Sequence, residues 1–116
     1  MIKYEEMSDF EVNTAVVKAL RLPFKSEFCN VFLDHGFDEG ACVYTRVDYC
    51  NNPNDAWPII VDNEISLVKD KEVDWWSARS GVVEWSYESM GHDFYFDDDN
   101  PLRAAMIVFL MMKEAE

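Results

Sequence analysis

Residues 97–112 read DDDNPLRAAMIVFLMM, and this stretch decides the fold. Asn100 is a favoured helix N-cap, and Pro101 suits the first helical position, where its missing N–H makes no helical hydrogen bond anyway. From Ala104 to Met112 no residue is polar, so a helix here has no side suited to water. The sequence therefore predicts a C-terminal helix that its own fold or a second chain encloses on several sides.

A second helix is predicted near the start of the chain. Ser8 and Glu11 have the spacing of a capping box, in which each side chain bonds the other residue's backbone N–H. Apolar residues then recur at the spacing of one helical face, and Pro23 ends the pattern. We place this helix at residues 9–21.

The middle of the chain carries mainly strand signals. Alternating residues predict a strand at 41–49, and Asn, Pro and Asp predict a loop at 51–55. Further strands are predicted at 57–61 and 65–68 as a hairpin, at 74–79 and 82–87 as a pair, and at 94–96. A short helix is predicted around 25–34. The expected fold is a single α+β domain over residues 1–116, with an antiparallel sheet of four to five strands covered on one face by the N- and C-terminal helices.

The composition restricts the classes of partner. Lys and Arg total 10 against 23 Asp and Glu, which gives a formal net charge of −13. Such a surface repels phosphates and anionic lipids, so neither direct nucleic-acid binding nor membrane binding is expected. The apolar run at 104–112 is too short for a membrane span. Because the three cysteines lack a CxxC pattern and no signal peptide is recognised, we expect a reducing, cytoplasmic location.

Four segments resemble the NinX-type family of small, uncharacterised proteins of tailed phages and prophages. They are Trp57-Pro58-Ile59-Ile60, Ile65-Ser66, Trp75-Trp76-Ser77-Ala78 and Asn100-Pro101-Leu102-Arg103-Ala104-Ala105-Met106, and the helix from Ser8 to Leu20 is similar to the family's opening helix. The resemblance implies phage or prophage origin and expression inside an infected cell. It implies no catalytic residues.

No cofactor, metal site or catalytic site is predicted. Cys29, His35, Cys42 and Cys50 fit no zinc spacing, and we interpret the cysteines as small buried core residues. The acids at Asp93 and 97–99 lack the ligand order of an EF-hand, and the helix dipole accounts for those before Asn100. Nothing in the sequence identifies a nucleophile, so enzyme activity is not predicted.

The tryptophans are the candidate recognition residues. Trp57, Trp75, Trp76 and Trp85 fall on neighbouring predicted strands. Adjacent strand residues point to opposite faces, so one of Trp75 and Trp76 is expected to face the uncovered side of the sheet. A tryptophan beside Arg79 or Arg46 would suit a ligand ring or the hot spot of a partner protein. Packing within the sheet is the alternative for these residues.

Two interpretations remain for the C-terminal helix. It is either a central core helix or the seam of a homodimer that buries Ala104, Val108 and Met111, with Met112 adaptable at the same surface.

For function, the leading hypothesis is a non-enzymatic phage accessory protein that binds a host or phage protein. The alternatives are a binder of a small nucleotide-like ligand in an aromatic-lined pocket, and an acidic mimic of nucleic acid.

Overall fold

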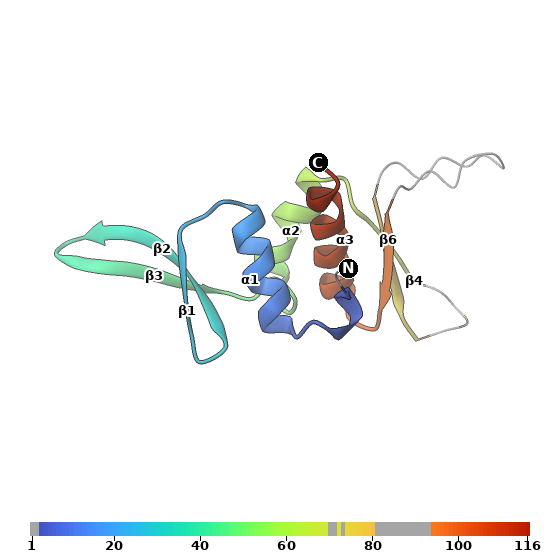
Figure 1. Cartoon of the computed structure of the whole chain (residues 1–116), viewed down its shortest axis with the longest axis horizontal. Helices are drawn as coiled ribbons and strands as arrows, with labels where there is room; N and C mark the ends of the chain where they lie inside the picture. The colour runs from blue at the N-terminus through green and yellow to red at the C-terminus, as the bar shows by residue number, and fades with distance from the viewer. Residues whose placement is uncertain (1–2, 70–71, 73, 81–93) are drawn as a thin grey trace.

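The structure, a computed structural model, describes residues 3–69, 72, 74–80 and 94–116. Within these residues the elements, in chain order, are η1 (Tyr4–Glu6), α1 (Asp9–Ala19), β1 (Phe24–Glu27), β2 (Asn30–Asp38), β3 (Ala41–Val47), α2 (Pro53–Asp62), β4 (Ser66–Lys69), β5 (Trp76–Arg79), β6 (Tyr95–Asp98) and α3 (Pro101–Glu114). The three α-helices lie between two antiparallel sheets, β1-β2-β3 at one end and β4-β5-β6 at the other (Figure 1). The molecule is elongated, with principal extents of 59 × 28 × 24 Å.

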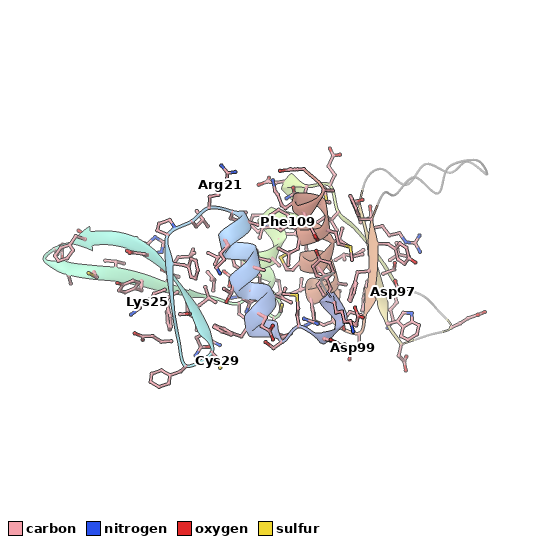
Figure 2. The ribbon with its side chains drawn as sticks, viewed as in Figure 1. Arg21, Lys25, Cys29, Asp97, Asp99 and Phe109 are labelled. Atoms are coloured by element: carbon pink, nitrogen blue, oxygen red, sulfur yellow. The ribbon has the colours of Figure 1, made fainter. Side chains whose placement is uncertain are left out.

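Helix α3 lies at the centre of this arrangement. It contacts α1 and α2 on one side and strands β5 and β6 on the other (Figure 1). All side chains from Ala104 to Leu110 are buried, and Phe109, labelled in Figure 2, is among the largest of the fully buried ones. The predicted enclosure of this helix is confirmed, and one chain is sufficient to provide it.

Both predicted helix starts are confirmed in atomic detail. Ser8 Oγ accepts a hydrogen bond from the Glu11 backbone N–H at 3.1 Å, and Glu11 Oε1 accepts from the Ser8 N–H at 3.2 Å. Asn100 Oδ1 accepts from the backbone N–H groups of Leu102 and Arg103 at 3.0 and 3.3 Å. These bonds satisfy N–H groups that have no partner within their own helix.

Asn100 also connects α3 to the segment that follows β3. Its Nδ2 donates to the Cys50 carbonyl oxygen at 2.7 Å and to Asn51 Oδ1 at 3.2 Å. One side chain therefore both caps the helix and fixes it against a distant part of the chain.

Arg103 holds the first residues of the chain against α3. Its Nε donates to the Asp98 carboxylate at 2.8 Å, and its Nη2 donates to the carbonyl oxygens of Met7 and Tyr4 at 2.8 and 3.1 Å. Its Nη1 lies 3.6 Å from the Asp9 carboxylate.

The prediction of a loop at 51–55 and a strand at 57–61 is wrong, because residues 53–62 form helix α2. Asn52 Oδ1 accepts from the Asn54 N–H at 3.0 Å, and a proline occupies the first helical position, as in α3. The buried residues Ala56, Ile59 and Ile60 have the spacing of one helical face. The start signal and this face outweigh the β-branched residues that favoured a strand.

The helix predicted around 25–34 is also wrong. These residues form the β1–β2 hairpin, in which Glu27 pairs with Asn30 across the two-residue turn Phe28-Cys29. Both turn residues have positive φ, 51° and 61°, which matches the twist of a two-residue hairpin. Figure 2 shows Cys29 at this turn. No glycine marks the turn, so composition gave no signal for it.

The α+β class is confirmed, but the single sheet of four to five strands covered on one face is not. The described strands form two sheets of three, separated by α2 in the sequence and by the helices in space. A helix with apolar residues on every side needs cover from more than one direction, and the second sheet supplies it. The strand predicted at 82–87 lies outside the described residues.

Candidate functional site

The outer face of the β4-β5-β6 sheet, on the side away from α3, carries the candidate site. Side chains alternate between the two faces along a strand, and Ala78 in β5 is fully buried on the α3 side. Ser77 and Arg79 therefore point outward. Ser77 is paired with Val68 in β4 and with Asp97 in β6, so residues from three strands meet on this face.

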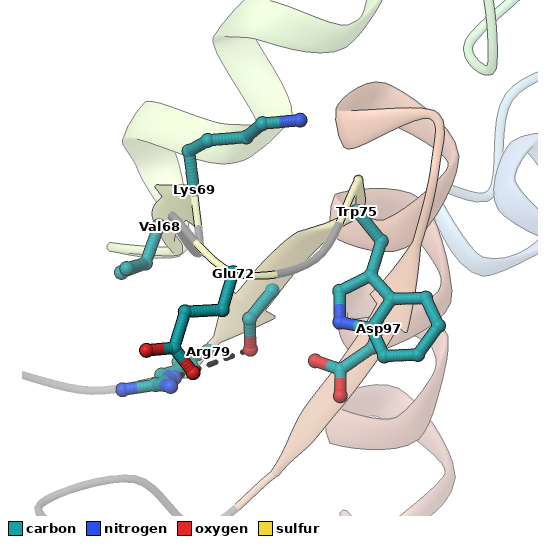
Figure 3. Close-up of a pocket in the computed structure, with 7 residues that line it drawn as sticks. Val68, Lys69, Glu72, Trp75, Arg79 and Asp97 are labelled. Carbon is teal, nitrogen blue, oxygen red and sulfur yellow. Dashed lines mark hydrogen bonds between the residues drawn. The ribbon is translucent and has the colours of Figure 1, made fainter.

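A shallow depression of about 400 Å³ lies on this face (Figure 3). Its lining combines an indole, two cations, two carboxylates, a hydroxyl and an aliphatic side chain, supplied by Trp75, Lys69, Arg79, Glu72, Asp97, Ser77 and Val68. We call this set the Trp75–Arg79 depression. It offers groups of both charges beside an aromatic surface.

Arg79 is held in place at the floor of the depression. Its Nε donates to Ser77 Oγ at 3.2 Å, and Ser77 itself is buried. Figure 3 shows the Glu72 carboxylate directed toward the Arg79 guanidinium. A guanidinium fixed in this way presents its donors in a planar fork that suits a carboxylate or a phosphate.

Trp75 forms the opposite wall, with Asp97 below its ring (Figure 3). Its side chain is 48% exposed although the residue is large and apolar. The indole ring therefore offers area for stacking or for burial by a partner, while the carboxylate of Asp97 accepts hydrogen bonds.

The expectation that Trp75 and Trp76 separate agrees with the described geometry. Trp75 lies just before β5 and lines the outer depression, whereas Trp76 shares the face of Ala78 and is half-buried. Lys69 Nζ lies 5.7 Å from the centre of the Trp76 ring, which places a cation at the limit of useful attraction.

The other predicted recognition residues do not join this site. Trp57 lies on α2, not on a strand, and is 58% exposed. Arg46 lies in β3, which belongs to the other sheet, and its Nε donates to Asn30 Oδ1 at 3.1 Å. Trp85 lies outside the described residues.

The residues proposed for a core helix or a dimer seam lie mostly inside the chain. Ala104 and Val108 are fully buried by its own elements, and Met111 and Met112 pack against the core with partial exposure. This burial fits the core interpretation and leaves Ala104 and Val108 without surface to offer a second copy.

The cysteine interpretation is correct for only one residue. Cys50 is buried, and burial raises the pKa of its thiol to about 12. Cys29 and Cys42 are exposed, so the prediction of buried core residues is wrong for both. They lie on hairpin residues that project from the core, which the sequence pattern did not indicate.

The acids considered for cation binding are divided by the sheet. Asp97 and Asp98 are neighbours in β6, so they point to opposite faces, Asp97 into the depression and Asp98 toward Arg103. In the part of the chain that the structure describes, no group of three His, Cys, Asp or Glu side chains is arranged to hold a metal ion. Asp93 lies outside that part.

Sequence reasoning missed Lys69 and Glu72, and it considered Ser77 and Asp97 only in other roles. The alternation of residues 75, 77 and 79 was a usable signal for Ser77. The contribution of Asp97 follows only from the pairing of β5 with β6, which joins residues about twenty positions apart.

Fold and site together define a small acidic α+β protein with a mixed aromatic and charged surface on one sheet. Among its described residues, no helix has both the length and the apolar character needed to cross a bilayer. The family described as "Bacteriophage P22, NinX" matches residues 3–113, and the chain belongs to this family of phage proteins. The resemblance found in the sequence is thereby confirmed. No curated protein matches the chain.

Proposed function

We propose that this phage protein is a non-enzymatic accessory protein that binds a host or phage protein inside the infected cell. The observation that carries the proposal is the half-exposed Trp75 in the same depression as Arg79, whose Nε donates to Ser77 Oγ. Tryptophan and arginine, with tyrosine, are the residue types most enriched in binding hot spots.

The surroundings of this pair support recognition of a protein surface. The sheet face is broad and shallow, and Val68 and Tyr95 extend its apolar area on both sides of β5. Charges of both signs at Arg79, Glu72 and Asp97 would fix the orientation of a partner and disfavour partners of mismatched charge. The mixture of signs also argues against mimicry of a phosphate backbone on this face.

The test is affinity capture from infected-cell lysate with three baits: the wild-type chain, Trp75→Ala and Trp57→Ala. Trp57 is a matched control, because it is the same residue, is slightly more exposed and lies on α2. A specific partner should be retained by wild type and Trp57→Ala, and its recovery with Trp75→Ala should fall about tenfold or more. Capture of nothing above background at low and physiological salt, or equal recovery by both variants, would contradict the proposal.

A second candidate function is binding of a small planar anion such as a nucleotide. The observation that favours it is the depression itself, whose volume of about 400 Å³ lies within the range of ligand pockets. Stacking on Trp75 and a bidentate bond from Arg79 are the expected contacts.

Thermal-shift measurements against a nucleotide library test this candidate. A ligand present at a hundred times its Kd adds about 2.7 kcal/mol of stability, which raises Tm by about 10 °C in a chain of this size. An unchanged Tm with every compound, or a shift that Arg79→Ala leaves intact, would eliminate it.

A further inference from the structure

Strand β3 is an edge strand that projects from the body of the protein. It lies at the end of the sheet order β1-β2-β3, and in the described part of the chain β2 is its one strand partner. Figure 1 shows the β2–β3 hairpin extending away from the helices. The backbone N–H and C=O groups on the outer side of β3 are therefore available to another strand.

The sequence of β3 favours such pairing. Residues 41–45 contain no charge and no proline, and Val43, Tyr44 and Thr45 have high strand propensity. Proteins usually protect an exposed edge with a lysine, a proline or a bulge in the edge strand itself. Here the first charge on β3 is Arg46, near the body of the molecule.

The bulge lies in the neighbouring strand and turns an aromatic side chain outward. Pairing runs from Asp34 with Tyr44 to Phe37 with Cys42, so β2 accommodates one extra residue relative to β3. Gly36 takes a φ of 84°, and its N–H donates to Asp34 Oδ1 at 2.8 Å, which fixes the bulge. The shift puts Phe37 opposite Cys42, and Phe37 is 74% exposed.

Phe37 and Tyr44 then lie on one face of the hairpin. Cys42 and Tyr44 are two residues apart in β3 and share a face, and Phe37 is the cross-strand partner of Cys42. Lys25 Nζ lies 4.0 Å from the centre of the Tyr44 ring, which limits the positions open to that ring. Next to the open edge there is thus an aromatic surface for the side chains of an added strand.

The charge of the hairpin indicates what would pair there. The outer part of the hairpin, residues 34–45, includes Asp34, Asp38 and Glu39 and no Lys or Arg, so its formal charge is −3 with His35 neutral. Lys25 and Arg46 lie on the face of Tyr44 closer to the helices, so the acidic part is the end of the hairpin. The whole chain carries −13, which adds a long-range field of the same sign. A second copy of this chain, a nucleic acid or an acidic peptide would be repelled, whereas a basic segment would be attracted.

We propose that the open edge of β3 binds an extended basic segment of a partner protein, which adds as a fourth strand with apolar side chains against Phe37 and Tyr44. Backbone pairing supplies affinity in this mode, and alternate side chains supply specificity. The proposal rests on the proposed function in that the chain is a binding protein, but it uses the opposite end of the molecule from the Trp75–Arg79 depression.

The test uses the full chain and a synthetic peptide of about eight residues in which lysine alternates with leucine, the length of an ordinary strand. Binding is followed by amide NMR shifts at low salt. We expect the largest shifts in β3 and at Phe37, slower exchange of the amide protons on the outer side of β3, and about tenfold weaker binding by Phe37→Ala. Asp38→Asn combined with Glu39→Gln should weaken binding and reduce its dependence on salt.

Phe28→Ala is the matched control, because Phe28 lies in the same sheet at the β1–β2 turn and is 93% exposed. It should bind as wild type does. Shifts spread over the acidic surface, equal binding by Phe37→Ala and Phe28→Ala, or equal binding of a glutamate–leucine peptide would overturn the proposal. Dimerisation through β3 without peptide, lost in Phe37→Ala, would show instead that the occupant is a second copy.

Trp75→Ala separates the two proposals. If it keeps peptide binding at β3 but loses its partner from lysate, both proposals stand. If the peptide fails to bind while capture still depends on Trp75, only the edge-strand proposal fails. If the peptide binds but capture does not depend on Trp75, only the proposal for the Trp75–Arg79 depression fails.

Discussion

Substitution of Asn100 by alanine is predicted to destabilise the protein more than loss of an ordinary helix cap. The side chain accepts hydrogen bonds from Leu102 and Arg103 through Oδ1 and donates to the carbonyl of Cys50 through Nδ2. Alanine removes both functions at once. The expected loss therefore has two parts, which the chain allows to be measured separately.

The magnitude follows from these contacts. Loss of a helix N-cap costs about 1 kcal/mol of unfolding free energy. The Cys50 residue is fully buried, so its carbonyl oxygen would lose a partner where water has no ready access, at a cost of about 1–3 kcal/mol. Asn100→Ala should therefore lose roughly 2–4 kcal/mol, and Asn100→Ser, which keeps a cap acceptor, should lose mainly the second part.

Asn52→Ala is the matched control for the cap. Asn52 caps α2 through one bond to the Asn54 N–H and is exposed. The Asn52→Ala substitution should lower the free energy of unfolding by about 1 kcal/mol. Urea unfolding followed by far-ultraviolet circular dichroism gives all three values, and the m-value should stay constant if each variant unfolds in two states.

The reasoning would be refuted if Asn100→Ala and Asn52→Ala lost the same free energy within about 0.5 kcal/mol, the limit of additivity for independent sites. That result would mean that the bond to the Cys50 carbonyl contributes nothing beyond the cap. An Asn100→Ser variant as stable as wild type would lead to the same conclusion, because serine keeps a cap acceptor and removes the bond to the Cys50 carbonyl.

Two further predictions concern titrating groups. Burial raises the pKa of the Cys50 thiol to about 12, so this thiol stays protonated in the folded protein. A thiol reagent should therefore modify Cys29 and Cys42 in the folded protein and Cys50 only after unfolding. Labelling of Cys50 before unfolding would contradict its burial. Burial, with a smaller contribution from Asp55, also raises the pKa of Tyr49 to about 12, above its ordinary value of 10. The unfolded chain then loses this proton at lower pH than the folded one, so urea unfolding should show stability falling as pH rises from about 10 to 12, and Tyr49→Phe should flatten that decline.

Much of the secondary structure was predictable because its signals are local. The capping box at Ser8 and the Asn100-Pro101 pair specify helix starts through bonds that span three residues. The same logic would have found α2, since Asn52-Pro53 repeats the start signal of α3. The strand interpretation gave more weight to Ile59-Ile60-Val61, whose β-branched residues are common in strands but tolerated in a helix that buries them.

The candidate site was predictable only in its outline. Adjacent tryptophans at the start of a strand had to separate between faces, which indicated that Trp75 or Trp76 would be exposed. Arg79 follows on the face of Trp75 by the period of the strand, and the structure places both in one depression. Trp57 and Arg46 were plausible neighbours only if all strands belonged to one sheet.

The sequence by itself determined the nature of α3: a capped helix without a polar side, which had to be enclosed. It also determined the acidic charge that shapes every proposal about partners. Only the tertiary structure decided how the enclosure is made, with α1 and α2 on one side and β5 and β6 on the other. The physical reason is range: caps and periodicity act over three or four residues, whereas strand order depends on pairing between distant segments whose local patterns are alike. That pairing brings Asp97 beside Ser77 and leaves β3 at an open edge.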